Sequence, residues 1–427
     1  MRAVLRAGVG LLAVLAACRR TPAAVPADAT ADGDAEVAPD VPAAPRCTAL
    51  DTRWIVPGAA SDDAGAEAGY ESIEVAGARA LLTDTRTGRL RLVRADDPHE
   101  ATLALEGEHS DPRLLHLGRA PDAEPVVAWV AQRMTGRQHF VRVAARLDRG
   151  CEQPEGRDEG LSLAAASTAR GALLAWDEEG PAPAAGHILV QAVGPEALRP
   201  VSSRGVAGAC PAPRQISPPE QDASDPVAVG LGDGAAVFWL TSRDVEGGEE
   251  HNETVTDLWG VAVNAAGVVR GTPLRLTRGP GHRFGLALAA SDASTVWVAW
   301  RNAPESDAES RGDGGEVALA RVSASAAGVV RVDRTAVVSA VGDVPTGAPV
   351  VWAQGGQVAV WWRARRDGRV VTMRRRVDGT GQPDANGPQE EPTAGGRLPL
   401  GAVGDGAVAL LRTTSGGGVG IARLRCP

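Results

Sequence analysis

The chain has 427 residues and a formal net charge of −9, and all of its fixed positive side-chain charge is arginine, because the sequence contains no lysine. A net negative charge does not suit a polyanionic partner, so we expect no nucleic-acid binding. No run of about 20 apolar residues occurs, which argues against a transmembrane helix.

The first seventeen residues have the layout of a signal peptide. Two arginines precede the apolar run 7–15, which is too short to span a bilayer as a helix. The run leads into Leu-Ala-Ala-Cys, ending at Cys18, which resembles the lipobox of bacterial lipoproteins. The resemblance implies that residues 1–17 are removed and that Cys18 becomes the lipidated first residue. The alternative is an ordinary signal peptide with a chance cysteine.

The segment after Cys18 indicates a tether and an address. Attachment through more than one acyl chain is effectively permanent. Arg19 is not the aspartate that retains many such lipoproteins in the inner membrane, so we expect the outer membrane rather than the inner one. Residues 19–46 hold five prolines and five acidic residues among many alanines. Such a composition cannot bury a core, so we expect 18–46 to be a lipidated, disordered tether.

A short apolar segment recurs through residues 47–427. Its copies end at Leu82, Trp129, Trp176, Trp239, Trp300, Trp362 and Leu411. Around each copy four short strands follow one another, and those of the fifth copy are 286–289, 296–300, 317–322 and 330–338. Four strands in about 40 to 60 residues are typical of propeller blades. We therefore predict an all-β fold, a seven-bladed β-propeller of four-stranded antiparallel blades, with tryptophans filling the space between neighbouring blades.

The two ends of the repeat array predict how the ring closes. The seventh copy has only three strands, 398–403, 408–411 and 419–424, before the sequence ends. Residues 50–56 precede the first copy and belong to no other blade. We expect them to supply the missing fourth strand, which removes the open edge. Tandem immunoglobulin-like sandwiches are the alternative, but they need about 100 residues each, more than this repeat provides.

With Cys18 lipidated, four cysteines remain, an even number that indicates disulfides in an exported protein. Cys426 ends the third strand of the last copy and Cys47 begins the strand that completes it. We predict a bond between them, in the place where a short turn joins the third strand to the fourth in blades two to six. Cys151 and Cys210 follow the third strands of consecutive copies, which allows a bond between them without determining it.

The sequence contains little that indicates catalysis. No zinc spacing, nucleophile elbow, phosphate loop or dinucleotide fingerprint occurs, so we predict no catalytic residue and no organic cofactor. The loops between second and third strands in copies four and five form an acidic rim, comprising Asp244, Glu246, Glu249, Glu250, Asp307, Glu309 and Asp313. The simpler interpretation is solvated loops that keep an exported protein soluble. Calcium or a cationic ligand is the alternative.

On its lipobox and its repeat, the sequence resembles the propeller lipoproteins of GC-rich Gram-negative bacteria such as myxobacteria. The resemblance carries over no functional residue. It implies a cell-envelope lipoprotein that displays a β-propeller for binding or scaffolding, with an envelope protein or a glycan as its partner. The alternative is a propeller-type polysaccharide hydrolase or lyase with paired carboxylates around the central channel, and no such pair can be picked from the sequence.

Overall fold

The structure of the protein is a computed structural model. The residues that it describes are 47–56, 70–76, 79–84, 89–94, 101–105, 109–118, 123–132, 139–146, 149–153, 162–179, 186–200, 208–244, 254–279, 281–303, 314–324, 328, 330–354, 356–394, 398–399, 401–403, 407–413 and 419–425. Cys18, the predicted signal peptide and the predicted tether therefore lie outside the described residues. Within the described ranges, no helix has the length and apolar character needed to cross a membrane.

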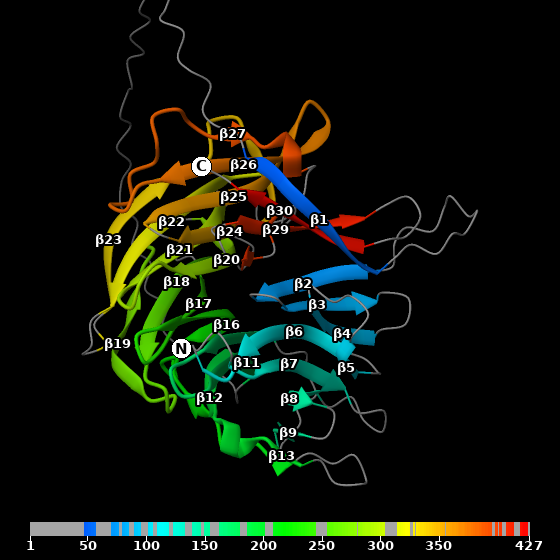
Figure 1. Ribbon diagram of the computed structural model, residues 1–427. Coiled ribbons are helices and arrows are strands. Elements are labelled where there is room, and N and C mark those ends of the chain that lie inside the picture. Colours follow the sequence, from blue (N-terminus) through cyan, green and yellow to red (C-terminus); the bar gives the residue numbers. More distant parts are fainter. Residues whose placement is uncertain are drawn as a thin grey trace, which may run out of the picture. The chain divides into compact units, whose positions relative to one another are not determined.

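The described residues form seven sheets (Figure 1). We number them in chain order, so the sheet that begins with β2 is sheet one. Sheet one contains β2 (Tyr70–Ala76), β3 (Arg79–Asp84), β4 (Arg89–Arg94) and β5 (Ala101–Leu105). Sheet two contains β6 (His109–His116), β7 (Pro125–Gln132), β8 (His139–Arg146) and β9 (Arg149–Glu152), with β13 (Arg199–Pro200) and β14 (Gly208–Ala209) added to β9. Sheet three contains β10 (Leu163–Ser167), β11 (Ala172–Glu179), β12 (Gly186–Val193) and β15 (Arg214–Gln215).

The remaining sheets follow the same plan. Sheet four contains β16 (Asp222–Leu231), β17 (Gly234–Asp244), β18 (Thr254–Val263) and β19 (Val269–Arg275). Sheet five contains β20 (His282–Ala290), β21 (Thr295–Ala303), β22 (Glu316–Ala324) and β23 (Val330–Val337). Sheet six contains β24 (Val344–Gln354), β25 (Gln357–Arg366), β26 (Arg369–Val377) and β27 (Gln389–Glu390). Sheet seven contains β28 (Gly401–Val403), β29 (Ala407–Thr413), β30 (Val419–Arg425) and β1 (Thr48–Val56).

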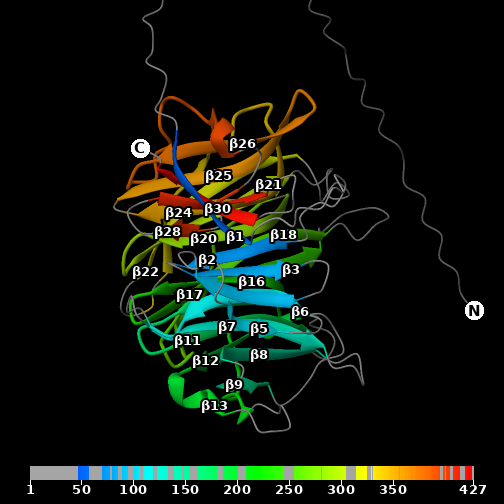
Figure 2. The ribbon, with the colours of Figure 1, turned by 45° about the vertical axis from the view of Figure 1, so that its right-hand side comes forward.

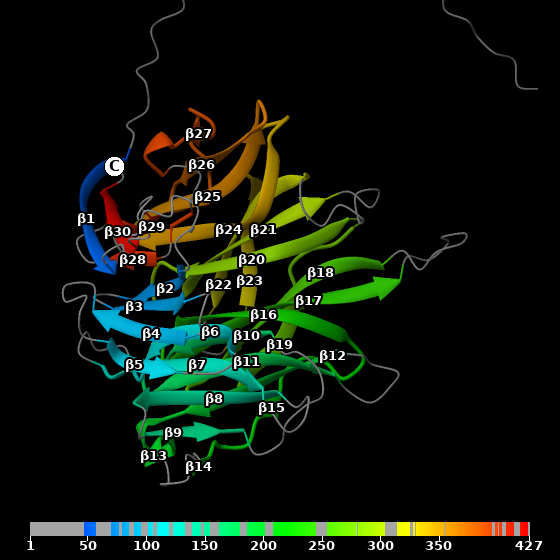
Figure 3. The same ribbon diagram turned by 90° about the vertical axis from the view of Figure 1, so that its right-hand side faces the viewer.

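Contacts between sheets arrange them in a closed succession (Figure 3). The first strand of each sheet packs against the first strand of the next, from β2 against β6 through to β20 against β24, and β28 packs against β2. Sheet six meets sheet seven through a shared apolar cluster in which Trp361 packs with Ala422 and Leu424. This arrangement, built largely from antiparallel four-stranded sheets, is a β-propeller, which confirms the all-β propeller predicted from the repeat.

The recurring tryptophans are buried between sheets, as the repeat predicts. Trp129 packs with Leu81, Leu90 and Leu92 of the preceding sheet. Trp176, Trp239, Trp300 and Trp362 likewise belong to apolar clusters that span two consecutive sheets. Because both faces of the second strand are covered in this way, it reads as a continuous apolar run instead of an alternating one.

The first strands of four sheets share a backbone irregularity. β6, β16, β20 and β24 each carry a register shift. A residue with positive φ lies at each shift, namely Asp111 (46°), Asp225 (51°), Gly285 (65°) and Gly347 (68°). A bulge of this kind bends a strand and increases its twist, which lets the innermost strand of each sheet curve away from its neighbours.

The ring closure is the pairing of β1 with β30 (Figure 2). The two strands run antiparallel, with Thr48 opposite Arg425 and Val56 opposite Val419. The N-terminal strand therefore completes the last sheet, as predicted. Cys47, one residue before β1, is disulfide-bonded, and its main-chain N–H donates to Oε2 of Glu391 at 3.0 Å. Cys426 lies outside the described residues, so its pairing with Cys47 stays a prediction.

One expectation about the blades is wrong. A short turn does not join the third and fourth strands throughout, because β12 ends at Val193 and β15 begins only at Arg214. We call residues 194–213 the sheet-three insertion; they include β13 and β14, which pair with the neighbouring sheet. In sheet six, too, 378–388 separate β26 from β27. The insertion is proline-rich, and proline removes the donor that a continuing strand needs, so the chain leaves its own sheet before it returns.

Candidate ligand pocket beside the sheet-three insertion

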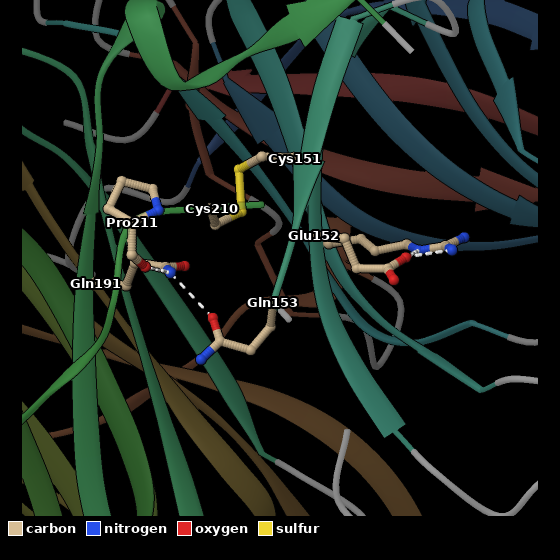
Figure 4. Close-up of a disulfide and its surroundings, with 7 residues drawn as sticks. Cys151, Glu152, Gln153, Gln191, Cys210 and Pro211 are labelled. Atoms are coloured by element: carbon tan, nitrogen blue, oxygen red, sulfur yellow. Dashed lines mark hydrogen bonds and ion pairs between the residues drawn. A yellow bond between two sulfur atoms is a disulfide. The ribbon is translucent and has the colours of Figure 1, made fainter. Parts of the chain in front are cut away.

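The insertion is fastened to the outer edge of sheet two. β13 pairs antiparallel with β9, with Arg199 opposite Gly150, and β14 pairs parallel with it, with Gly208 opposite Cys151. Cys151 and Cys210 are both buried and form a disulfide, with their Cα atoms 4.9 Å apart (Figure 4). The structure thereby settles this pairing, which the sequence left open. By pairing with β9, β13 and β14 also cover an edge strand that would otherwise expose unpaired main-chain groups.

Hydrogen bonds fix the path of the chain after Cys210. The main-chain N–H of Cys210 donates to the Glu152 carbonyl at 2.9 Å. Gln191 of β12 is 1 % exposed, and its side-chain amide donates to Oε1 of Gln153 at 3.0 Å and to the carbonyl of Pro211 (Figure 4). Cys210 and Pro211 are therefore held by residues of both sheet two and sheet three.

This path borders an open pocket of about 440 Å³. The lining residues come from the turn between β10 and β11, the end of β12, both ends of the insertion, the start of β15 and the turn between β18 and β19. They are Arg170, Gly171, Ala192, Val193, Gly194, Glu196, Pro211, Ala212, Arg214, Ala265 and Ala266. A volume of this size is in the range of small-molecule sites, roughly 300 to 1,000 Å³.

Small residues keep the pocket open and its backbone close-packed. A Cβ at Gly171 would lie 2.3 Å from the carbonyl oxygen of Val193. A Cβ at Gly194 would lie 2.3 Å from Oε1 of Glu196, so the carboxylate is folded against this glycine. The Val193 carbonyl is main chain and cannot move aside, so glycine is required at position 171, whereas the exposed Glu196 side chain can turn away from a side chain placed at position 194.

The pocket carries two arginines and one acid. Arg170, Arg214 and Glu196 are all exposed. Within the part of the chain that the structure describes, none of the three makes an ion pair. The side chain of Asp233 is bound by Arg270, whose two terminal nitrogens lie 2.9 and 2.8 Å from its carboxylate oxygens. Hydrogen bonding from Arg270 and the charge of Arg170 lower the pKa of Asp233.

Two carboxylates, those of Asp177 and Asp225, lie close together at the contact between sheets three and four, and a hydrolase would need such a pair. Asp177 accepts the main-chain N–H of Ser162 at 2.6 Å and that of Asp225 at 3.1 Å. Burial raises the pKa of Asp177, and the charge of Asp225 raises it further. Both oxygens of Asp177 accept hydrogen bonds from main-chain N–H groups. We therefore interpret Asp177 as a structural residue that links sheets three and four and stabilises the bulge at Asp225.

The acidic rim falls almost entirely outside the described residues. Asp244 is the last residue of β17, opposite Thr254. The remaining members, Glu246, Glu249, Glu250, Asp307, Glu309 and Asp313, are not described, and the rim with its calcium stays a prediction. Among the residues that are described, no group of three or more His, Cys, Asp or Glu could hold a metal ion.

Sheet four, which carries Asp244 at the end of β17, also contains a buried ionic cluster. Asp257 of β18 is 1 % exposed. Its Oδ2 accepts from Nε of Arg243 at 2.9 Å and from Arg275 at 2.5 Å. Because both arginines come from strands adjacent to β18, this acid crosslinks three strands of one sheet.

Sequence reasoning did not find the pocket, because its lining comes from four separate segments. The available signal was the proline-rich stretch around Cys210, which lengthens the third repeat unit. That signal marks an insertion, but it does not say which sheet the insertion packs against.

No protein-family model matches the sequence, and no curated protein matches it. Solved structures that resemble it include an α-L-arabinanase of Penicillium chrysogenum complexed with arabinobiose, with TM-score 0.37, 11% identity, and coverage of 74% of this chain and 92% of that one. The β-propeller domain of the Trilobed protease from Pyrococcus furiosus has TM-score 0.37, 10% identity, and coverage of 86% and 89%. The polysaccharide lyase Uly1 has TM-score 0.41, 7% identity, and coverage of 84% and 88%. At this level of similarity the fold assignment rests on the chain's own sheet topology.

Proposed function

We propose that this chain is a cell-envelope lipoprotein, anchored through Cys18, that displays a seven-bladed β-propeller for binding or scaffolding. The observation that carries the proposal is the pocket beside the sheet-three insertion. Here the repeating sheet plan is interrupted by strands that pair with the neighbouring sheet, and residues of the interruption line a concave, charged surface. Ligand sites on rigid scaffolds are commonly built on such inserted segments.

The proposed location follows from the first 46 residues. A signal peptide, a lipidated cysteine and a proline-rich tether would hold the propeller away from the membrane surface, with the outer membrane as the address. A disulfide between Cys151 and Cys210 suits an oxidising compartment outside the cytoplasm. The partner would be an envelope protein or a glycan.

Binding is favoured over catalysis by what the pocket contains. Its lining has one carboxylate, Glu196, whereas glycoside cleavage by a hydrolase commonly uses two. Asp177 and Asp225 lie together elsewhere, but main-chain donors occupy both oxygens of Asp177. No described observation therefore favours the hydrolase or lyase alternative over binding.

The test combines location and capture. Cys18→Ser should move the protein out of the membrane fraction or stall its processing. Wild-type protein should retain an envelope protein or glycan that Ala212→Trp, which fills the pocket, does not retain. Val341→Trp, at an exposed position remote from the pocket lining, is the matched control and should behave as wild type. Equal capture by wild type and Ala212→Trp would reject the pocket as the binding site.

A further inference from the structure

We propose that the pocket beside the sheet-three insertion binds a small hydroxylated carboxylate, of the kind found in acidic sugars, through Arg170 and Arg214. The inference rests on the proposed function, since it names the ligand class of that same site. It starts from three observations, namely two arginines without an ion-pair partner in the described residues, a single carboxylate in the same lining, and a wall that is fixed before any ligand arrives.

The arginines supply the charge for an anion. A guanidinium offers five N–H donors and no acceptor, and its planar fork matches the two oxygens of a carboxylate. Both arginines line one pocket, so an anion bound there would face two positive charges. An anion is therefore the ligand charge that the lining complements.

Glu196 narrows the class of anion. Its carboxylate lies against Gly194 in the same lining and reduces the formal charge of the pocket from two positive charges to one. A singly charged carboxylate suits this balance better than a doubly charged phosphate, because the second charge would face Glu196. The ionised carboxylate of Glu196 can only accept hydrogen bonds, so it can bind a hydroxyl group of the ligand, which donates one. Carboxylate and hydroxyl groups on one small molecule satisfy both features.

The pocket is preorganised, which lowers the cost of binding. Pro211 and Ala212 directly follow a disulfide-bonded cysteine, and Gln191 holds the Pro211 carbonyl. Elsewhere in the lining, Gly171 packs its backbone against Val193. Walls fixed in this way lose little conformational entropy when a ligand binds. The volume of about 440 Å³ is large enough for a small ligand of this kind.

The experiment is calorimetric titration of the full-length protein with glucuronate, glucose, acetate and inorganic phosphate. Glucuronate should bind, glucose should not bind detectably, and acetate and phosphate should bind more weakly than glucuronate. Arg170→Gln and Arg214→Gln should each weaken glucuronate binding roughly tenfold, since each removes charge-assisted hydrogen bonds. Both arginines are exposed, so these variants should fold. Arg369→Gln, at an exposed position on β26, is the matched control and should bind as wild type.

Oligogalacturonate added in a separate titration distinguishes a polymer-borne carboxylate from a free hydroxy acid, since a polymer site should bind it more tightly than the monomer.

Each contrary result overturns the inference in a different way. Equal binding of glucose and glucuronate, both lost in Ala212→Trp, would keep the pocket as the proposed site but reject an anionic ligand. Tighter binding of phosphate would reject the carboxylate, and glucuronate binding that survives in the double arginine variant would place the anion site elsewhere. No binding of any probe would reject the ligand class, while capture of an envelope partner by wild type would still support the proposed function.

Discussion

The ring closure and the sheet-three insertion both add strands to a sheet from elsewhere in the chain, but they are held in different ways. β1 is nine residues long and pairs with β30 from Thr48 to Val56, with two register shifts. β13 and β14 have two residues each and pair with β9 at two positions each. The closure is thus held by a full strand ladder, whereas the insertion depends on a disulfide and the side chain of Gln191. We therefore expect the closure to govern the stability of the whole ring and the insertion to govern the pocket.

The largest effect is expected at the closure. Replacing Cys47 or Cys426 by serine should lower the free energy of unfolding by on the order of 5 kcal/mol, because the predicted bond would close a loop of nearly the whole propeller. Denaturant unfolding measures the loss, and a non-reduced digest should contain a peptide that links the two cysteines. A digest in which Cys47 is joined to another residue would show that the ring closes differently.

A somewhat smaller loss is expected at the insertion. Cys210→Ser opens a loop with a sequence separation of 59 residues, for which the chain-entropy model gives about 4 kcal/mol. Unlike the closure variants, it should also weaken glucuronate binding, because Pro211 and Ala212 lose their fixed anchor. Titration of Cys210→Ser beside Cys47→Ser separates the two effects. If both variants bind glucuronate equally well, the insertion does not shape the pocket.

Glu391 tests the closure without breaking a covalent bond. It is 2 % exposed and accepts the main-chain N–H of Cys47 at 3.0 Å. Glu391→Gln keeps the shape but removes the charge, so we expect a loss of about 2 kcal/mol in unfolding free energy. Glu196→Gln, at an exposed glutamate in the pocket, is the matched control and should leave stability unchanged. A loss of equal size in the control would assign the effect to net charge instead of to the closure.

The smallest effect is the pH dependence contributed by Asp233, whose carboxylate lies near the pocket. Hydrogen bonding from Arg270 lowers its pKa in the folded state from 3.8. A lowered acid pKa stabilises the fold above the unfolded-state value, and this contribution disappears as the pH falls through the folded-state value. Unfolding of Asp233→Asn should therefore show a shallower decline than wild type in strongly acidic solution. Because the side chain is exposed, the difference should be small, and a steeper decline in Asp233→Asn would contradict it.

The sequence alone determined the sheet plan and the closing strand of this protein. Apolar runs ending at Trp129, Trp176 or Trp239 are local patterns, and they mark the second strand of each sheet because that strand is buried on both faces. The missing fourth strand of the last copy was likewise visible as a gap in a repeat, and β1 fills it.

The tertiary structure alone decided how the insertion folds and what it creates. Segments that are distant in sequence are joined by the disulfide of Cys151 with Cys210 and by the attachment of β13 and β14 to a neighbouring sheet, and Arg170 and Arg214 come to line one pocket. Local patterning cannot specify such contacts, because hydrophobic periodicity records which face of a strand is buried and not which segment covers it. The insertion has no hydrophobic periodicity. Its position therefore depends on the free edge of β9 and on the disulfide with Cys151, which exist only in the folded structure.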